Sequence, residues 1–242
     1  MNITTLRLKS IGLGLAALFA VLVIQVVGAN PTFAAPQTWD GSAADGKFST
    51  AANWASNSVP VNGDTLTFPG GTTAPYTLDN DLNATVKFGN VTVSGAQSYI
   101  INDLTLQTGT VAVTSTGTLT VTNGLASDGA LTLNGNNLLT IGTLTVSSGD
   151  LTVSSQFLAT TANLAASAIL SSIFSVTNTL TVGGALTVNQ NITVGALDVG
   201  TNLVISSNFT ATNGITVGGN LTMSGSPVIT TTGGAIAVTG TA

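Results

Sequence analysis

Two carboxylates lie two residues apart in the segment LDNDLNA, at Asp79 and Asp81. In an extended strand such residues share one face, so the pair could work as general acid and base or bind Ca²⁺. The spacing excludes an EF-hand, because Ala84 and Asn90 stand where that loop requires Gly and Glu. We therefore expect either a looser, turn-bound Ca²⁺ or a solvated turn at this segment.

The rest of the sequence offers few groups for catalysis. It contains no Cys, no His and no Glu, so all nine acidic residues are Asp, and only four residues are Lys or Arg. General acid–base catalysis draws mainly on His, Glu, Asp, Lys and Cys. We predict a protein that is not an enzyme and has no cofactor other than Ca²⁺, for which Asp128-Gly129 and Asp150 are alternative sites. A carbohydrate-active parallel β-helix fragment using Asp79 and Asp81 is the alternative.

Both tryptophans, Trp39 and Trp54, lie in residues 35–75, which also hold four of the six prolines. Exposed indole rings could bind a sugar by stacking. The segment also reads as a cap, because bulky side chains such as Phe48 and Phe68 would cover the open end of a β structure, and proline cannot extend strand pairing. We favour the cap for these tryptophans over the sugar site.

The N-terminus has the order of a secretory signal. Arg7 and Lys9 precede the apolar residues 11–24, and small residues follow up to Ala34. The pattern predicts removal of residues 1–34, with cleavage after Ala34 or, alternatively, after Ala29. An uncleaved anchor is the competing interpretation, since residues 11–29 are nearly long enough to span a bilayer. We expect a secreted or cell-surface protein.

Without residues 1–34, Lys47 and Lys87 are the only cations against nine Asp, so the net charge is 2 − 9 = −7. Clustered Lys and Arg are needed to bind phosphate backbones or anionic lipid. The composition therefore predicts neither a nucleic-acid partner nor a membrane partner beyond the export signal.

Residues 76–242 repeat a short word of aliphatic, Thr, aliphatic, as in Leu180-Thr-Val182 and Leu186-Thr-Val188. In a strand the two aliphatic residues point into a core and Thr points to solvent. The words follow each other every five to eight residues, which is too close for ordinary hairpin strands. This predicts a parallel β-helix, or β-solenoid, in which strands and corners alternate around one axis.

Equivalent positions indicate the length of one coil. Aliphatic residues recur at intervals of 17 and 18 in two series, Leu186, Leu203 and Leu221, and Leu180, Leu197 and Ile215. Three faces of about six residues would give coils of about 18 residues and roughly nine coils, each strand stacking on its equivalent at about 4.8 Å.

Two alternatives stay open at this level. Asn-Gly pairs such as Asn123-Gly124 and Asn213-Gly214 could form the hairpins of an antiparallel β-sandwich. The Ala-rich residues 156–176 could form a short helix, although Leu158, Leu164, Leu170 and Val176 keep a six-residue interval. We expect residues 156–176 to stay in the coil stack.

The motifs TWDG (38–41), STAANW (49–54), VP (59–60) and GDTLTFPG (63–70) resemble the head of bacterial secreted β-solenoid surface proteins. Those are adhesin-like chains built from autotransporter-associated or similar β-strand repeats. The resemblance covers about 35 residues, and it implies a parallel β-helix that displays a binding or spacer surface outside the cell. The membrane β-barrel that a self-exporting member would carry is missing, so residues 76–242 could be a truncated repeat region.

We expect a non-catalytic adhesin or structural spacer that contacts extracellular glycans, surface proteins or further copies of itself. Outward Thr pairs suggest ice binding as a further alternative, since flat Thr ladders occur in ice-binding solenoids. The pairs are Thr65/Thr67, Thr118/Thr120, Thr143/Thr145 and Thr179/Thr181. They are scattered along the chain, however, and Thr is a common exposed strand residue.

Overall fold

The structure, a computed structural model, describes residues 34–72 and 76–242. The predicted signal peptide, apart from Ala34, lies outside the described residues. Ala34–Ala242 form one unit. Within the described ranges, no helix combines the length and the apolar character that crossing a membrane requires.

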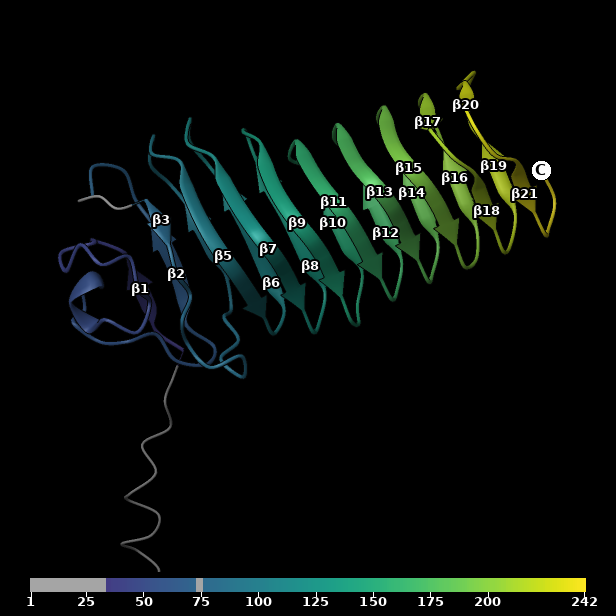
Figure 1. The fold of residues 1–242 in the computed structure, drawn as a ribbon. Helices are drawn as coiled ribbons and strands as arrows, with labels where there is room; N and C mark the ends of the chain where they lie inside the picture. The colour runs from purple at the N-terminus through teal and green to yellow at the C-terminus, as the bar shows by residue number, and fades with distance from the viewer. Residues whose placement is uncertain (1–33, 73–75) are drawn as a thin grey trace, which may run out of the picture. The chain divides into compact units, whose positions relative to one another are not determined.

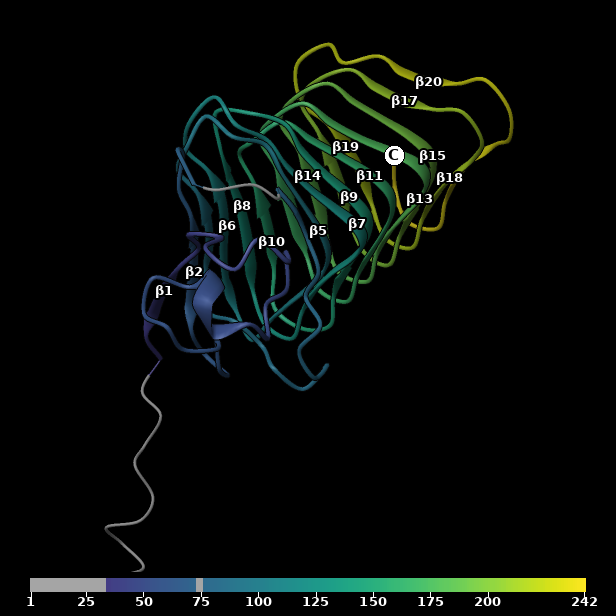
Figure 2. The same cartoon turned by 60° about the vertical axis from the view of Figure 1, so that its left-hand side comes forward.

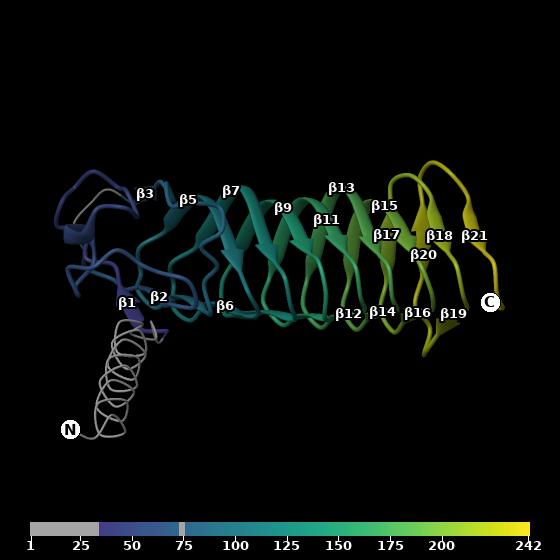
Figure 3. The ribbon, with the colours of Figure 1, turned by 90° about the horizontal axis from the view of Figure 1, so that it is seen from below.

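The unit is a parallel β-solenoid of about nine turns, with coils of about 19 residues, and this confirms the predicted fold class. Figure 1 shows the strands stacked side by side from β1 to β21, and Figure 3 shows the coils in profile. The one helical element is a 3-10 turn, η1 (Ala51–Asn53), among the described residues.

Two sheets enclose the core, and Figure 2 shows them on opposite sides of the coil. The ten-stranded sheet contains, in spatial order, β1 (Pro36–Thr38), β2 (Thr65–Phe68), β4 (Val91–Val93), β6 (Gly109–Val113), β8 (Leu131–Gly135), β10 (Leu151–Val153), β12 (Ala168–Leu170), β14 (Leu186–Val188), β16 (Leu203–Ile205) and β19 (Leu221–Met223). The eleven-stranded sheet contains β3 (Thr77–Leu78), β5 (Tyr99–Leu106), β7 (Leu119–Ser127), β9 (Leu139–Val146), β11 (Phe157–Leu164), β13 (Phe174–Val182), β15 (Ile192–Val199), β17 (Phe209–Ala211) and β20 (Ile229–Thr231), with β18 (Ile215–Val217) and β21 (Ile236–Val238) alongside.

Every pair of neighbouring strands is parallel, so the antiparallel sandwich is wrong. Leu186 pairs with Leu203, and Leu203 pairs with Leu221, as the intervals of 17 and 18 predicted. Residues 156–176 are strands β11 and β12 and the start of β13, so they belong to the stack.

Each coil carries three words but commonly only two strands. β15, for example, runs through both Ile192-Thr-Val194 and Leu197-Asp-Val199, and then divides its pairing between β17 and β18. The register shifts between the two words of β7 and of β13, each of which has one residue more there than the strands on either side. The corner between the second and third words is therefore a bend within a strand.

The core is filled by the first and third residue of each word. Leu186 and Val188 are fully buried while Thr187 is partly exposed, which is the alternation expected of a strand with one buried face. Phe157 and Phe174 stack in neighbouring coils with ring centroids 4.8 Å apart. Leu158, between buried Phe157 and Ala159, points outward and is 36% exposed.

Candidate functional site

The Asp79–Asp81 segment joins the N-terminal residues to the first coils. Asp79 forms an isolated parallel bridge with Lys47. The amide of Phe48 donates to the carbonyl of Asp79 at 3.0 Å, and the amide of Asp79 donates to the carbonyl of Gly46 at 2.9 Å. The backbone of this segment therefore pairs with residues 46–48.

The two carboxylates have separate partners. Asp79 Oδ1 accepts a hydrogen bond from Asn102 Nδ2 at 2.6 Å, whereas Asp81 accepts from the amide of Ser49 at 2.8 Å and from its hydroxyl at 2.6 Å. Burial raises the pKa of Asp81, but the two hydrogen bonds from Ser49 outweigh this, so the pKa lies below its ordinary value. The two carboxylates thus link the segment to Asn102 and Ser49, and no hydrogen bond joins them to each other in the described structure.

The other acidic turns are also engaged. Asp128 pairs with Lys87, and Asp150 Oδ1 accepts from the amide of Ser167 at 3.1 Å. Across the described ranges, no three His, Cys, Asp or Glu side chains lie close enough together to hold a metal ion. Calcium binding at Asp79 and Asp81 stays a prediction.

Trp39 and Trp54 are both fully buried, with ring centroids 5.1 Å apart in an edge-to-face arrangement. Phe48 and Phe68 pack against them, with centroids 5.2 Å and 6.2 Å from Trp54. Neither indole presents a free face in this structure, which sugar stacking requires. The four rings form an aromatic cluster beside β2.

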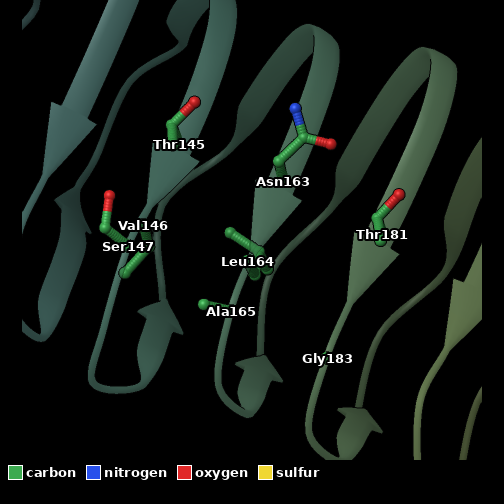
Figure 4. Close-up of a pocket in the computed structure, with 8 residues that line it drawn as sticks. All are labelled: Thr145, Val146, Ser147, Asn163, Leu164, Ala165, Thr181 and Gly183. Atoms are coloured by element: carbon green, nitrogen blue, oxygen red, sulfur yellow. The ribbon is translucent and has the colours of Figure 1, made fainter.

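The outward residues of the third word form a row along the eleven-stranded sheet. Asn163 pairs in register with Thr145 on one side and Thr181 on the other, and Thr181 pairs with Asp198. Figure 4 shows the side chains of Thr145, Asn163 and Thr181 pointing to the same side of neighbouring strands. Beside them lies a shallow, open hollow of about 330 Å³, whose floor includes Leu164 and Gly183.

A second hollow, of about 290 Å³, lies next to the Asp79–Asp81 segment. Asn80, Asp103 and Thr105 line it, together with Leu82 and Val86. Asn80 Oδ1 is buried there without a hydrogen-bond partner, and Asp103 Oδ2 accepts from an asparagine of the next coil. The lining of this hollow is more polar than that of the first, and the hollow is more enclosed.

A longer outward row, which the scattered Thr-x-Thr pairs of the sequence do not reveal, follows the ten-stranded sheet. It occupies the middle position of six consecutive strands and consists of Thr132, Thr152, Ile169, Thr187, Val204 and Thr222. We call it the β-branched row. The Thr-x-Thr pairs drew attention to single coils, whereas the signal for this row is the middle residue of every third word.

Polar side chains also form ladders at the corners. Asn189 Nδ2 lies 3.2 Å from Ser171 Oγ, and Ser206 Oγ lies 3.3 Å from Asn189 Oδ1, so three coils are linked in sequence. At the other end of β16, Asn202 Oδ1 accepts from the amide of Asn220 at 2.9 Å. These bonds satisfy backbone and side-chain groups where the sheet pairing stops.

Comparison of the chain with family models, with curated proteins and with solved structures found no match. Its geometry is that of a parallel β-solenoid with outward rows of mostly uncharged side chains and a buried aromatic cluster near the N-terminal end of the described residues.

Proposed function

We propose that this protein is a secreted or cell-surface, non-catalytic β-solenoid that acts as an adhesin or structural spacer. The observation that carries the proposal is the β-branched row, in which six coils present Thr, Ile and Val in register on one sheet face. Such a surface makes many weak contacts, and none of them depends on charge. Glycans, surface proteins or further copies of the chain are the partners it suits.

Two further features support this reading. Asp79 and Asp81, the best acid–base pair in the sequence, are hydrogen-bonded to Asn102 and Ser49. The N-terminal motifs resemble the heads of bacterial β-solenoid surface proteins with autotransporter-associated repeats, for which display outside the cell is the known role.

Binding of residues 35–242 to a panel of extracellular polysaccharides and to whole cells tests the proposal. An adhesin is expected to bind, and a variant with Thr152→Lys and Thr187→Lys should lose that binding. Thr145→Lys with Thr181→Lys, on the other sheet, is the matched control. A spacer should bind nothing in either form.

Cleavage of a polysaccharide that disappears in Asp79→Asn/Asp81→Asn would contradict the proposal and favour the β-helix enzyme. The same double substitution also interrupts contacts to Ser49 and Asn102, so its fold must be checked by circular dichroism. Unchanged cleavage in the variant would point to a contaminating activity.

Ice binding is a second candidate, and the β-branched row is the observation that favours it. Neighbouring strands place its methyl and hydroxyl groups about 4.8 Å apart, on a regular surface. Ice-growth inhibition by residues 35–242, lost on Thr152→Lys/Thr187→Lys and kept in the Thr145→Lys/Thr181→Lys control, would establish this function. Normal ice growth in the presence of the unsubstituted chain would remove it.

A further inference from the structure

Asp64 is a fully buried carboxylate near the N-terminal end of the solenoid. It lies in the turn before β2. Oδ1 accepts a hydrogen bond from the amide of Ala35 at 2.8 Å, and Oδ2 accepts from the amide of Val61 at 2.8 Å. Gln37 Nε2 adds a longer contact to Oδ2, at 3.4 Å. All these donors are neutral.

A buried carboxylate normally has a cationic partner, because removing a charge from water is costly. In the part of the chain that the structure describes, the cationic side chains are Lys47 and Lys87, and the one ion pair joins Lys87 to Asp128. Asp64 is thus buried without a counterion.

The backbone of Ala35 makes two hydrogen bonds, one of them to Asp64. Its amide donates to Asp64, while its carbonyl accepts from the amide of Thr65 at 3.0 Å. Ala35 is half-buried and Ala34 is exposed. The sequence independently predicts export cleavage after Ala34 or after Ala29.

We infer that export cleavage occurs between Ala34 and Ala35, and that the new α-ammonium group of Ala35 forms a buried ion pair with Asp64. This inference rests on the predicted export signal and is independent of what the solenoid binds. It selects one of the two cleavage sites, because cleavage after Ala29 would place the ammonium group five residues away and leave Asp64 with neutral donors only.

The chemistry is hydrolysis of one peptide bond by a signal peptidase of the exporting cell. Water supplies the oxygen of the new carboxylate at Ala34, and its hydrogens go to the Ala35 nitrogen and to solvent. At neutral pH that nitrogen takes up a further proton, so one amide N–H becomes three ammonium donors. The first already has its acceptor at 2.8 Å. Processing therefore adds the missing positive charge without moving the backbone.

The neighbouring titratable side chains, Asp40 and Lys87, have partners elsewhere. Asp40, at the far end of β1, accepts a hydrogen bond from the amide of Ser42 at 2.9 Å. Lys87, whose carbonyl contacts Gly63, has its ammonium group on Asp128. Asp64 is the carboxylate that contacts Ala35.

The cleavage site is tested by exporting the 242-residue chain from a secreting bacterium. Intact mass and N-terminal sequencing are expected to give a mature chain that begins at Ala35. A chain beginning at Asn30, or one that retains residues 1–34, overturns the inference.

The ion pair is tested with four proteins: a chain beginning at Ala35, a chain with Gly-Ser before Ala35, and the Asp64→Asn variant of each. The extension keeps the amide of Ala35 but moves the charge away. At pH 6 Asp64→Asn should raise the unfolding equilibrium constant of both chains. We expect this increase to be at least about tenfold larger in the chain that begins at Ala35 than in the chain with the Gly-Ser extension. Asp150→Asn, on a distant coil, should cost the same in both backgrounds. Equal costs of Asp64→Asn overturn the inference.

The pH dependence has a definite sign. A carboxylate partner raises the pKa of the α-amino group above its ordinary value of about 7.7–8.0. The extra stability of the unextended chain is then fully present below about pH 8 and is lost as pH rises through the raised pKa. Should Asp64→Asn fail to fold, pH-dependent reductive methylation of the unsubstituted chain decides, with a free Ala-Pro-Gln-Thr peptide as reference. An α-amino pKa no higher than in the peptide overturns the inference.

Discussion

At the scale of single residues, the N-terminal segment is held by polar groups whose roles differ from those their types suggest. Asp81 resembles half of a catalytic or calcium-binding pair in the sequence, yet it binds the backbone and the hydroxyl of Ser49. Asp64 resembles an ordinary Gly-Asp turn residue, yet it is fully buried. Both roles depend on partners about 30 residues away, at separations of 32 and 29, which local patterns do not reveal.

The lowered pKa of Asp81 predicts a pH-dependent contribution to stability. Its folded pKa lies below the ordinary value of 3.8, so the contribution is present above that value and is lost as pH falls through the folded pKa. Asp81→Asn should therefore destabilise the protein at pH 6, by about 1 kcal/mol or less because the group is exposed, and much less at pH 2.5. Urea denaturation at the two pH values measures this. Equal losses at both would contradict it.

The two buried tryptophans make a matched pair. Trp54 Nε1 donates to the carbonyl of Phe48 at 2.9 Å, whereas Trp39 Nε1 is buried without a partner. Replacement by Phe removes a similar amount of apolar surface from each, but only Trp54→Phe leaves a carbonyl without its donor. We expect Trp54→Phe to cost about 1 kcal/mol more than Trp39→Phe in urea denaturation. A larger cost for Trp39→Phe would contradict this account of the cluster.

At the scale of strands, the fold could be read from the sequence because its rules are local. The alternation within each word determines which side chains are buried, and the intervals of 17 and 18 correctly pair the words from β13 to β19. Earlier coils are longer, since Leu131 pairs with Leu151 and Leu119 with Leu139.

Leu158 is a position where the sequence pattern gives the wrong side-chain direction. The six-residue interval counts Leu158 among the core residues, but in FLATTANL the inward positions belong to Phe157 and to the small Ala159 and Ala162. An alanine carries too little hydrophobic signal to show that it faces the core.

Strand β11 offers a direct test of this reading. Leu164 is 3% exposed and Leu158 is 36% exposed in the same strand. Leu164→Ala opens a cavity among packed aliphatic side chains and should destabilise the protein by about 2–5 kcal/mol. Leu158→Ala should cost less than about 1 kcal/mol, because its side chain already contacts water. Thermal and urea unfolding of both variants would show a reversed order if the register were shifted by one residue.

The bend inside the long strands depends on close contact between coils. A Cβ added at Gly195 would lie 2.1 Å from the carbonyl oxygen of Asn178 in the preceding coil. At Gly124, in the same bend of an earlier coil, the nearest atoms are 3.6 Å away, which is ordinary contact. We expect Gly195→Ala to destabilise the protein by about 1–3 kcal/mol and Gly124→Ala to have little effect, both measured by urea unfolding. Similar losses at the two positions would show that the coils do not approach each other as described.

At the scale of the whole solenoid, stability comes from stacking and is almost independent of charge. Across the described residues one ion pair is present, between Lys87 and Asp128, and no disulfide can form because the chain has no Cys. Each coil contacts mainly the coil before and the coil after it. In such a stack, stability is approximately a sum of nearest-neighbour terms, so a coil with one neighbour is held less tightly than a coil with two.

In a protein of residues 35–242, the last coil should therefore open more readily than the middle of the stack. Met223 and Ile236 are 48% and 43% exposed, although each occupies a position that is buried in preceding coils. β19 and β21 also have a pairing partner on one side only. Amide hydrogen exchange should thus be fastest in β19–β21 and slowest in β11–β15, where both neighbours are present. Leu164→Ala should accelerate exchange in the middle coils first. Uniform protection along the stack would mean that the solenoid unfolds as a single cooperative unit, and it would contradict the nearest-neighbour account.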